Sequence, residues 1–435
     1  MKTKNASAQQ NSERPFWLLW LVTLVTSTAY LTWSAKLVGT FWIDELVTWY
    51  TIADSFALLV ETCARLDYPP GYFILLKCWV LALEAVGIGN SIFVMRMMGV
   101  VGFIFIIIAI TIQGRRALGR IQGLLLAILF MVSAPMLQSF AELRPYGFLC
   151  GLMTLALLFL VEVESHYRNP EPRFNVIIRL WIVYAFVVGA AMWMHLLAGV
   201  AAFALGFYWL LRCLMSPSPW FFAGGALAHA AALVSILPWL PVLRNQMIFR
   251  ANVPTHWMIP PSLENIIAVF PFWLTYGRPA TSPYSGNWIY MLMIGSIAIL
   301  IPIIYGIISL FRLPEQTGAR RGLQFVTLCA CFVMLLALIT SIEFANVFHA
   351  TRYPQIALGW WLAGLLLLTS QGRHGEINEK FSLILMSPWI CCTLVATFLT
   401  VQVQIRSIEV SAWTQDALAD LRPNPPRQGQ LIYVM

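Results

Sequence analysis

The sequence predicts an all-α polytopic membrane protein with about 11 transmembrane helices. Hydrophobic residues make up 60% of the 435 residues and charged residues only 11%, a composition that no soluble domain of this size shows. Long stretches contain no Asp, Glu, Lys or Arg, and crossing a hydrocarbon core of about 30 Å takes about 20 apolar residues. Basic residues gather in the short segments between these stretches, as topology signals do.

Net charge and cysteine usage exclude two other classes of protein. The net charge of +8 comes largely from loop residues that orient membrane spans, so it does not indicate a nucleic-acid partner. The eight cysteines form no disulfide framework, because most lie in or beside apolar stretches, where a thiol behaves as a small hydrophobic group. The cysteines in these positions are Cys150, Cys213, Cys329, Cys331, Cys391 and Cys392.

The first apolar stretch, 15–35, is predicted to be a retained transmembrane helix. It follows a polar, basic segment, 1–14, and lacks a cleavage site of small residues. We therefore expect 1–14 to form a cytoplasmic tail.

Segment 70–90 has two interpretations. Lys77 and Glu84 interrupt it and, seven residues apart, share one helical face. If the segment crosses the membrane, the basic cluster at 115–120 falls outside. If it lies along the interface, that cluster and the two later basic clusters fall inside. Charge topology favours an amphipathic interfacial helix over 70–87.

The charge-free run 180–211 is too long for one helix. Its 32 residues would span about 48 Å. Arg179 and Arg212 flank the run, so both ends are expected in the cytoplasm, which requires an even number of crossings. We predict a hairpin of two short helices with His195 near its outer tip.

These arguments divide the chain into a cytoplasmic tail, a transmembrane domain over 15–403 and an outer-face tail over 404–435. Outer loops at 36–90 and 244–286 are long, and chemistry on a helical scaffold is usually found in such loops. No matching pair of interrupted helices, the mark of many transporters, is evident. The predicted spans are 15–35, 91–113, 121–140, 145–162, 178–193, 197–212, 220–243, 287–311, 322–342, 354–371 and 381–403.

An adjacent carboxylate pair, Asp44-Glu45, stands just after the first span. Acidic groups at a membrane surface are costly to place. Two adjacent carboxylates on a helix point in different directions, so one can face a cavity as a general base while the other binds a cation or backbone. The alternative is a helix start, with Asp44 as N-cap and Glu45 in the first turn.

Two further motifs are expected to face the same side of the membrane. Tyr68-Pro69-Pro70 forms a rigid bend before a helix, with Tyr72 shortly after it. Glu142 and Arg144 stand between two apolar spans, where they would either hold an anionic phosphate or pair with each other.

Other polar residues are weaker candidates. Arg96 lies five residues into its span, near enough to the outer surface to snorkel. His195 is either structural or substrate-binding. Arg352, near His349, is followed by Tyr353-Pro354, and this Arg-Tyr-Pro sequence has the same residue types as Arg-Pro-Tyr at 144–146. Arg352 is therefore equally a phosphate ligand or an anchor at the start of a helix. Loop 244–286 would either cover a lipid-phosphate substrate or contact lipid headgroups through its basic residues Arg244, Arg250, His256 and Arg278.

Taken together, these motifs resemble those of the GT-C superfamily of glycosyltransferases. The resemblance rests on the acid pair after the first helix, the Pro-Pro turn, the early Arg96 and the Arg-Pro-Tyr element, over roughly 15–200. It is strongest for bacterial members of the protein O-mannosyltransferase, aminoarabinose transferase and RgtA-like group. The resemblance implies a GT-C-like bundle with juxtamembrane helices in the first outer loop.

The resemblance also implies an activity. Such enzymes transfer a sugar, with inversion, from a polyprenyl-phosphate donor to a glycan, lipid or protein acceptor on the outer face of the bacterial inner membrane. Asp44 matches the family's base or acceptor-orienting carboxylate, with Glu45 beside it. Cationic residues would bind the phosphate, and neighbouring polar groups would bind the rest of the substrate. The expected phosphate ligands are Arg144, Arg352 and Arg96, and the expected substrate-binding residues are Tyr68, Tyr72, Glu142 and His195.

The sequence departs from the family pattern at two points. Tyr68 replaces a basic residue before the prolines, and Glu142-Leu-Arg144 replaces an Asp-x-Asp element, so the resemblance names no metal ligand and leaves a Mg²⁺ or Mn²⁺ cofactor open. Two other functions fit a polytopic chain: a transporter or flippase of lipid-linked glycans, and a polymerase or ligase of such glycans. The first needs charges along a path to both faces, whereas most predicted spans have charge-free interiors.

Overall fold

The computed structural model describes most of the chain up to Ala251. Beyond Ala251 it describes mainly two helical regions, 317–343 and 353–369. The described residues are 2–37, 43–65, 68–89, 91–167, 171, 173–215, 218–251, 266, 269–270, 300, 304, 308, 317–343 and 353–369. The prediction of an all-α membrane protein is confirmed in this part of the chain, where every regular element is a helix.

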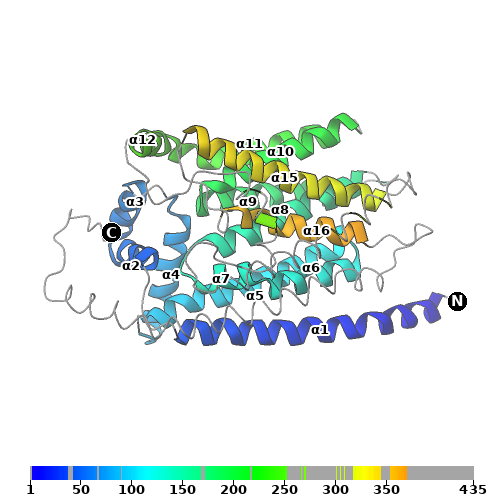
Figure 1. Ribbon diagram of the computed structural model, residues 1–435, viewed down its shortest axis with the longest axis horizontal. Coiled ribbons are helices and arrows are strands. Elements are labelled where there is room, and N and C mark those ends of the chain that lie inside the picture. The colour runs from blue at the N-terminus through cyan, green and yellow to red at the C-terminus, as the bar shows by residue number, and fades with distance from the viewer. Residues whose placement is uncertain are drawn as a thin grey trace.

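Most helices run side by side in one bundle, and several shorter ones, three of them consecutive in the chain, lie across one of its ends (Figure 1). The bundle consists of α1 (Lys2–Leu37), α5 (Ile92–Ala117), α6 (Arg120–Val132), α7 (Ala134–Ala141), α8 (Tyr146–Tyr167), α9 (Phe174–Met194), α10 (Leu197–Met215), α11 (Pro219–Ile236), α15 (Thr317–Glu343) and α16 (Leu358–Thr369). Short connecting elements are η1 (Leu237–Trp239), α12 (Leu240–Ala251) and η2 (Pro354–Ala357).

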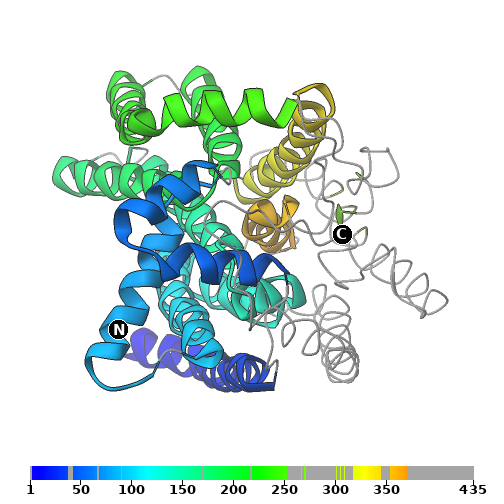
Figure 2. The same cartoon turned by 90° about the vertical axis from the view of Figure 1, so that its left-hand side faces the viewer.

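The three transverse helices define what we name the α4 end of the bundle. They are α2 (Ile43–Ala53), α3 (Phe56–Arg65) and α4 (Gly71–Ala85). Seen from that end, they cross in front of the bundle helices (Figure 2). With 15 residues, α4 is shorter than a membrane span and runs across the ends of the long helices, in agreement with the interfacial interpretation of 70–87.

Seven described helices are long and apolar enough to cross a membrane, or eight if the bent pair of α6 and α7 is one span. Each falls on a predicted span. A further apolar segment, Pro354–Thr369, is shorter and covers the prediction for 354–371. The predicted spans 287–311 and 381–403 lie outside the described residues, apart from single positions in the first.

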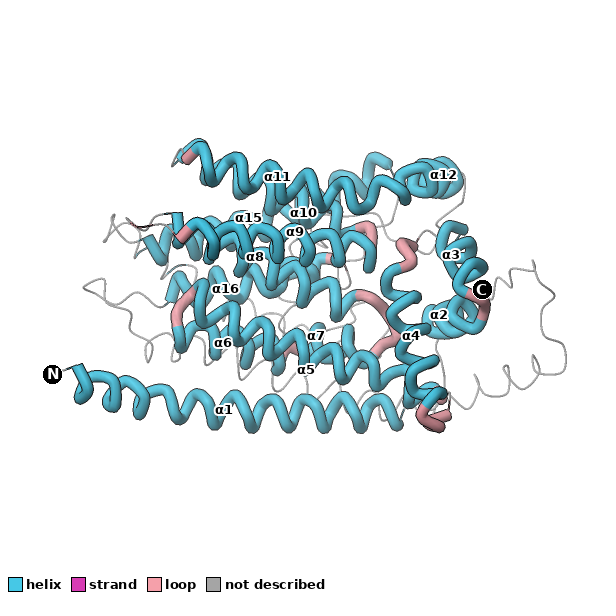
Figure 3. The backbone as a smooth tube through the Cα atoms, turned by 180° about the vertical axis from the view of Figure 1, so that it is seen from behind, coloured by secondary structure: helices cyan, strands magenta, loops and turns pink. Residues whose placement is uncertain are grey.

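The bundle is built around α8, whereas α1 lies along its edge (Figure 3). In the most apolar stretch of α8, 83% of residues are buried, against 17% in α1. The outward face of α1 carries Leu18, Leu21, Val22 and Val25, each more than half exposed. Such a face is expected where a helix contacts lipid rather than water.

The predicted span over 121–140 is present as a bent pair of helices. The helix breaks at Ser133, and α6 and α7 meet at 61°. Pro135 has no amide hydrogen and cannot donate to the carbonyl of Met131, four residues earlier. That carbonyl instead accepts a hydrogen bond from the hydroxyl of Ser27 in α1, at 3.2 Å. The bend therefore has a local cause and a partner that satisfies the carbonyl it exposes.

Two other predicted spans differ from the structure, one in its end and one in its continuity. The span expected over 145–162 continues to Tyr167, so that Glu162 and Glu164 lie within its last turns. The span expected over 220–243 is interrupted by η1, because Pro238 and Pro241 cannot donate backbone hydrogen bonds. The hairpin predicted for 180–211 is present, with the break between α9 and α10 at residues 195–196.

The end of the bundle opposite α4 is closed by ion pairs between helices. Glu164 of α8 accepts from Arg212 Nε at 2.9 Å, and both side chains are buried. Glu13 of α1 is 3.0 Å from Arg115 and 3.1 Å from Arg120. These pairs neutralise the charges that enter the helix ends and join helices far apart in the sequence.

Candidate active site

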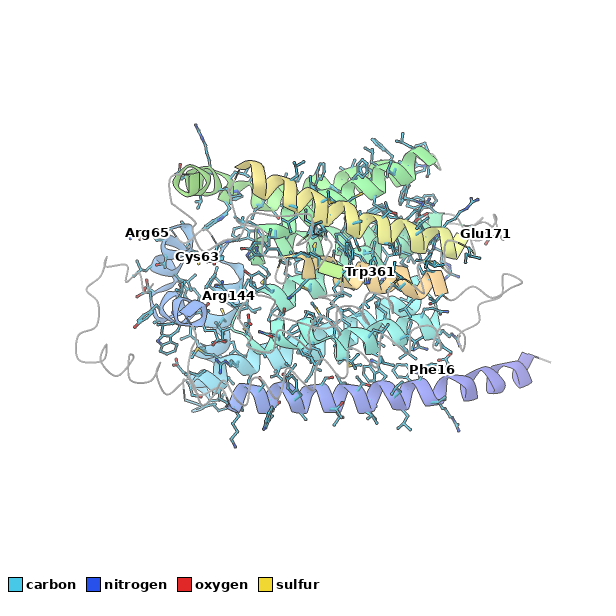
Figure 4. The ribbon with its side chains drawn as sticks, in the orientation of Figure 1. Phe16, Cys63, Arg65, Arg144, Glu171 and Trp361 are labelled. Atoms are coloured by element: carbon cyan, nitrogen blue, oxygen red, sulfur yellow. The ribbon has the colours of Figure 1, made fainter. Side chains whose placement is uncertain are left out.

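The candidate site lies at the α4 end of the bundle. Arg144, in the turn between α7 and α8, is seen beside α2 and α4, whereas Glu171 marks the opposite end (Figure 4). The site is formed by this turn, the segment before α4, the first turn of α2 and the tip of the α9–α10 hairpin.

The turn that carries Arg144 is fixed by its own backbone. Helix α7 ends at Ala141, and Glu142 takes an extended conformation with its amide bonded to the Gln138 carbonyl. The Arg144 amide donates to the Glu142 carbonyl at 2.8 Å. Pro145 then precedes α8, a position where proline favours the start of a helix. The Glu-Leu-Arg-Pro sequence thus brings the arginine back toward the bundle.

Arg144 is held by tyrosines. Its Nη2 donates to the Tyr68 hydroxyl at 3.3 Å. Its guanidinium carbon lies 5.4 Å from the centre of the Tyr68 ring and 5.8 Å from that of Tyr146, within the range of cation–π attraction. Only 5% of the side chain is exposed. These contacts fix the position of the guanidinium.

Tyr68 is placed by the Pro-Pro turn. Pro69 and Pro70 are buried, and α4 begins at Gly71. A Cβ on Gly71 would lie 2.5 Å from the carbonyl oxygen of Trp193 in α9, closer than real atoms approach. A glycine is therefore needed for α4 to start against the hairpin, and this close approach brings Tyr68 next to His195.

A buried ion pair anchors the helix that carries the two acids. Arg96 of α5 donates to Glu45 through Nε at 3.2 Å and Nη2 at 2.5 Å, and both side chains are at most 3% exposed. The Leu143 amide donates to the same carboxylate at 3.0 Å, and the Thr48 hydroxyl donates to the Leu143 carbonyl at 3.2 Å. Helix α2 is thereby tied both to the bundle and to the turn that carries Arg144.

His195 lies where α9 ends. It is in extended conformation, and its Nδ1 accepts a hydrogen bond from the Leu197 amide at 3.1 Å. Its ring centre is 5.3 Å from that of Tyr146, 6.1 Å from Tyr68 and 6.5 Å from Tyr353. Burial, and then the nearby Arg144 charge, lower the pKa of His195 to about 3.

Tyr72 and Glu142 lie beside this cluster in different environments. Tyr72 is fully buried against Phe73 and Phe148, and burial, followed by the Glu45 charge, raises the pKa of its hydroxyl. Glu142 is half-buried and accepts from the Gln138 amide group at 2.8 Å. Glu142 contacts Gln138, and Arg144 contacts Tyr68.

The structure therefore brings together most of the residues proposed from the sequence. Tyr68, Arg144 and His195 share one cluster. Glu45 and Arg96 form a pair of their own, so Arg96 has a carboxylate partner where a phosphate was expected. Their roles as a catalytic acid and a phosphate ligand remain predictions. Candidates outside the described residues are the Asp44 side chain, His349, Arg352 and the basic residues at 250, 256 and 278.

Sequence reasoning did not select Tyr146 and Tyr353 as site residues. They stand 6.4 Å apart, ring to ring, and both contact His195. Each follows an arginine within two residues, in Arg-Pro-Tyr and Arg-Tyr-Pro. The signal in the sequence that marks these tyrosines is the repeated motif, in which the arginines are the more polar residues.

The described acids do not form a metal site. No group of three or more His, Cys, Asp or Glu side chains with metal-binding spacing occurs within the described ranges. Glu45 is engaged by Arg96 and the Leu143 amide, and Glu142 by Gln138.

Comparison with known proteins gives distant structural matches only. Neither a protein-family model nor a curated protein matches the chain. The apo oligosaccharyltransferase of Archaeoglobus fulgidus is matched over 87% of this chain and 55% of its own, with 11% identity and a TM-score of 0.47. The same enzyme tethered to an acceptor peptide containing the NVT sequon is matched over 76% and 46%, with 10% identity and a TM-score of 0.44.

A third match is ArnT from Cupriavidus metallidurans in the apo state. It covers 68% of this chain and 66% of ArnT, with 14% identity and a TM-score of 0.34. The chain thus spans about half the length of the oligosaccharyltransferase chains, at 55% and 46%. Both proteins belong to the GT-C superfamily, whose motifs the sequence resembles. Since all three TM-scores lie below 0.5, no part of the proposed function rests on them.

Proposed function

We propose that this chain is a membrane glycosyltransferase that takes a sugar from a polyprenyl-phosphate donor. The observation that carries the proposal is the position of Arg144. It is a buried cation, held by Tyr68 and Tyr146, at the end of a multi-span bundle and next to the helix that begins with Asp44-Glu45. A cation for a phosphate and an acid for a hydroxyl are the two groups that such a transfer needs.

The proposed reaction assigns one role to each half of the site. The Asp44 carboxylate takes the proton of the acceptor hydroxyl while the hydroxyl oxygen bonds to the anomeric carbon. The bond between that carbon and the phosphate oxygen breaks on the opposite face, so the configuration inverts. Polyprenyl phosphate leaves with the bonding electrons, and Arg144 stabilises the negative charge that develops on its oxygen.

Glu45 has a positioning role in this scheme. Its carboxylate is bound by Arg96 and by the Leu143 amide, so it is not available to take a proton from the acceptor. The same bonds hold α2 against the 142–146 turn. The backbone of Asp44, one residue earlier, belongs to the same anchored helical turn. Arg352, which the sequence placed beside Tyr353, remains proposed as a second phosphate ligand.

A transporter is the second candidate, and the distribution of charge disfavours it. Among the described spans, buried charged residues lie near helix ends: Arg96 in α5, Glu162 and Glu164 in α8, and Arg212 in α10. A transport path for a charged headgroup would need polar groups near the middle of the bundle.

The test is a transfer assay with the protein in lipid nanodiscs. Membrane extract supplies the acceptors, and undecaprenyl-phosphate-linked sugars are the donors. Wild-type protein should release undecaprenyl phosphate, and Asp44→Asn should reduce the rate by about 100-fold or more while leaving thermal stability unchanged. Undiminished transfer by Asp44→Asn would remove Asp44 as the base. Flip of the intact donor across a vesicle membrane, without release of its phosphate, would favour the transporter.

A further inference from the structure

The tyrosine and histidine rings around Arg144 have a geometry that the roles above do not use. Tyr146, His195 and Tyr353 are in mutual ring contact, at 5.3, 6.4 and 6.5 Å between ring centres. They come from α8, the hairpin tip and the start of η2. Tyr353 and Tyr68 are only partly buried, so the cluster reaches the molecular surface at its edge.

The tautomer of His195 follows from its backbone bond. Because Nδ1 accepts the Leu197 amide hydrogen, it carries no proton, and a neutral ring then carries its proton on Nε2. Nε2 points away from the Leu197 amide. Within the described part of the chain, no side chain or carbonyl accepts a hydrogen bond from it. His195 thus presents a fixed N–H donor among aromatic rings.

The charges around the ring keep it neutral. Among the described residues, the titratable and charged groups that contact the ring or shift its pKa are Arg144, Tyr68, Tyr146 and Tyr353, of which only Arg144 is charged at neutral pH. Burial and Arg144 lower the pKa of His195 to about 3, so the ring is uncharged throughout the physiological range. A neutral ring supplies no positive charge to a leaving phosphate.

We propose that His195, with the Tyr146 and Tyr353 rings, forms the subsite for the sugar of the lipid-linked donor. This inference rests on the proposed function. The chemistry fits a neutral, hydroxylated ring: aromatic faces pack against its C–H groups, and the Nε2 hydrogen is donated to one of its oxygens. Arg144, on the Tyr68 side of the cluster, would bind the phosphate of the donor. His195 is then a specificity-determining residue rather than an acid or a base.

Two substitutions separate this role from a structural one. His195→Asn keeps an acceptor near the Nδ1 position for the Leu197 amide but removes the outward donor. His195→Gln places an amide N–H near the position of Nε2 and is the conservative replacement. Neither changes the charge of the site.

The experiment measures binding to protein in nanodiscs, with undecaprenyl phosphate and its mannosyl, glucosyl, galacturonosyl and arabinosyl derivatives as probes. Wild type should bind at least one sugar-carrying lipid about tenfold more tightly than undecaprenyl phosphate. His195→Asn should abolish this preference and leave affinity for undecaprenyl phosphate unchanged, whereas His195→Gln should retain most of it. Arg144→Gln should weaken all five lipids by a similar factor.

The outcomes distinguish the two proposals. Equal binding of all five lipids by wild type, or an undiminished preference in His195→Asn, would overturn the sugar subsite while leaving the glycosyltransferase proposal intact. The subsite is also overturned if His195→Asn weakens undecaprenyl phosphate and its sugar derivatives equally. If wild type binds none of the polyprenyl phosphates, the proposed function itself fails. Nitrogen NMR of histidine-labelled protein, assigned with His195→Asn, should show Nδ1 unprotonated from about pH 5 to 8.

Discussion

Two buried arginines at opposite ends of the bundle, Arg212 and Arg144, are held by different groups, while a third, Arg96, is bound by Glu45 at the α4 end. At the end away from α4, Arg212 is bound by Glu164, and Arg115 and Arg120 approach Glu13. At the α4 end, the contacts seen for Arg144 are tyrosine rings and a tyrosine hydroxyl. A carboxylate partner neutralises an arginine and ties two helices together. Tyrosine rings hold a guanidinium by cation–π attraction, which brings no negative charge of its own.

The largest effect should come from breaking a buried ion pair at each end. Glu45→Ala leaves Arg96 buried without this carboxylate, and Glu164→Ala does the same to Arg212. Each should lower the free energy of unfolding by about 3–5 kcal/mol, measured by chemical denaturation in detergent. The two should differ in activity. Turnover per folded molecule should fall only in Glu45→Ala, since Glu45 also positions the Asp44 helix. Equal turnover in both variants would contradict that positioning role.

Removing the charge of Arg144 should affect activity more than stability. Arg144→Gln is expected to reduce transfer by about 100- to 1,000-fold, because a cation that stabilises a developing oxyanion is worth about 2.7–4 kcal/mol. Arg212→Gln is the matched control at the other end. It should destabilise the fold and leave the turnover of folded protein near the wild-type value. A kinetic assay at saturating donor, with the folded fraction measured in parallel, checks both expectations.

The buried histidine should make the α4 end sensitive to acid. The pKa of His195 is lowered in the folded protein, so the unfolded chain binds more protons below its ordinary pKa of 6.5. The stability contributed by the neutral ring is complete above that value and is lost as pH falls toward about 3. Between neutral pH and about pH 4.5, wild type should lose about 2–3 kcal/mol more than His195→Gln. The measurement is the melting temperature of both proteins across this pH range. If the two plots of melting temperature against pH run parallel, the predicted role of His195 is wrong.

The smallest effect should come from the Tyr68 hydroxyl. Tyr68→Phe keeps the ring over Arg144 and removes one hydrogen bond at 3.3 Å. We expect a loss of about 1 kcal/mol, seen as a roughly fivefold weaker affinity for undecaprenyl phosphate. Tyr68→Leu removes the ring as well and should weaken binding further through the lost cation–π contact. If the two variants behave alike, the ring contributes nothing to holding Arg144.

The positions of the spans were predictable because a bilayer demands long apolar runs, and charges can enter only near their ends. The break between α9 and α10 followed from length and flanking arginines alone. The bend at Ser133 was not predicted, since residues 121–141 are apolar throughout and the effect of Pro135 depends on Ser27 from another helix. The hydropathy of a segment indicates whether a helix is surrounded by lipid or protein, but it does not indicate whether the helix axis bends.

The site was predictable in part for a similar reason. Arg144 and His195 stand out because polar groups are rare in an apolar chain. Tyr146 and Tyr353 do not, because aromatic residues make up 14% of the sequence and have no distinguishing polarity. The partners of Glu45 could not be inferred either, since Arg96 and the Leu143 amide are 51 and 98 residues away. Contacts across such distances are determined by how the bundle packs.

The bend between α6 and α7 also sets the depth at which Arg144 meets the bilayer. Helix α7 has eight residues and is about 12 Å long. Tilted by 61°, it ends about 6 Å short of the height that a straight continuation of α6 would reach, and about 10 Å to one side. On the proposed function, with the α4 end at the membrane surface, Arg144 would lie nearer to the lipid headgroups than a straight helix would place it. A donor anchored by a long isoprenoid tail could then present its phosphate without being lifted out of the bilayer.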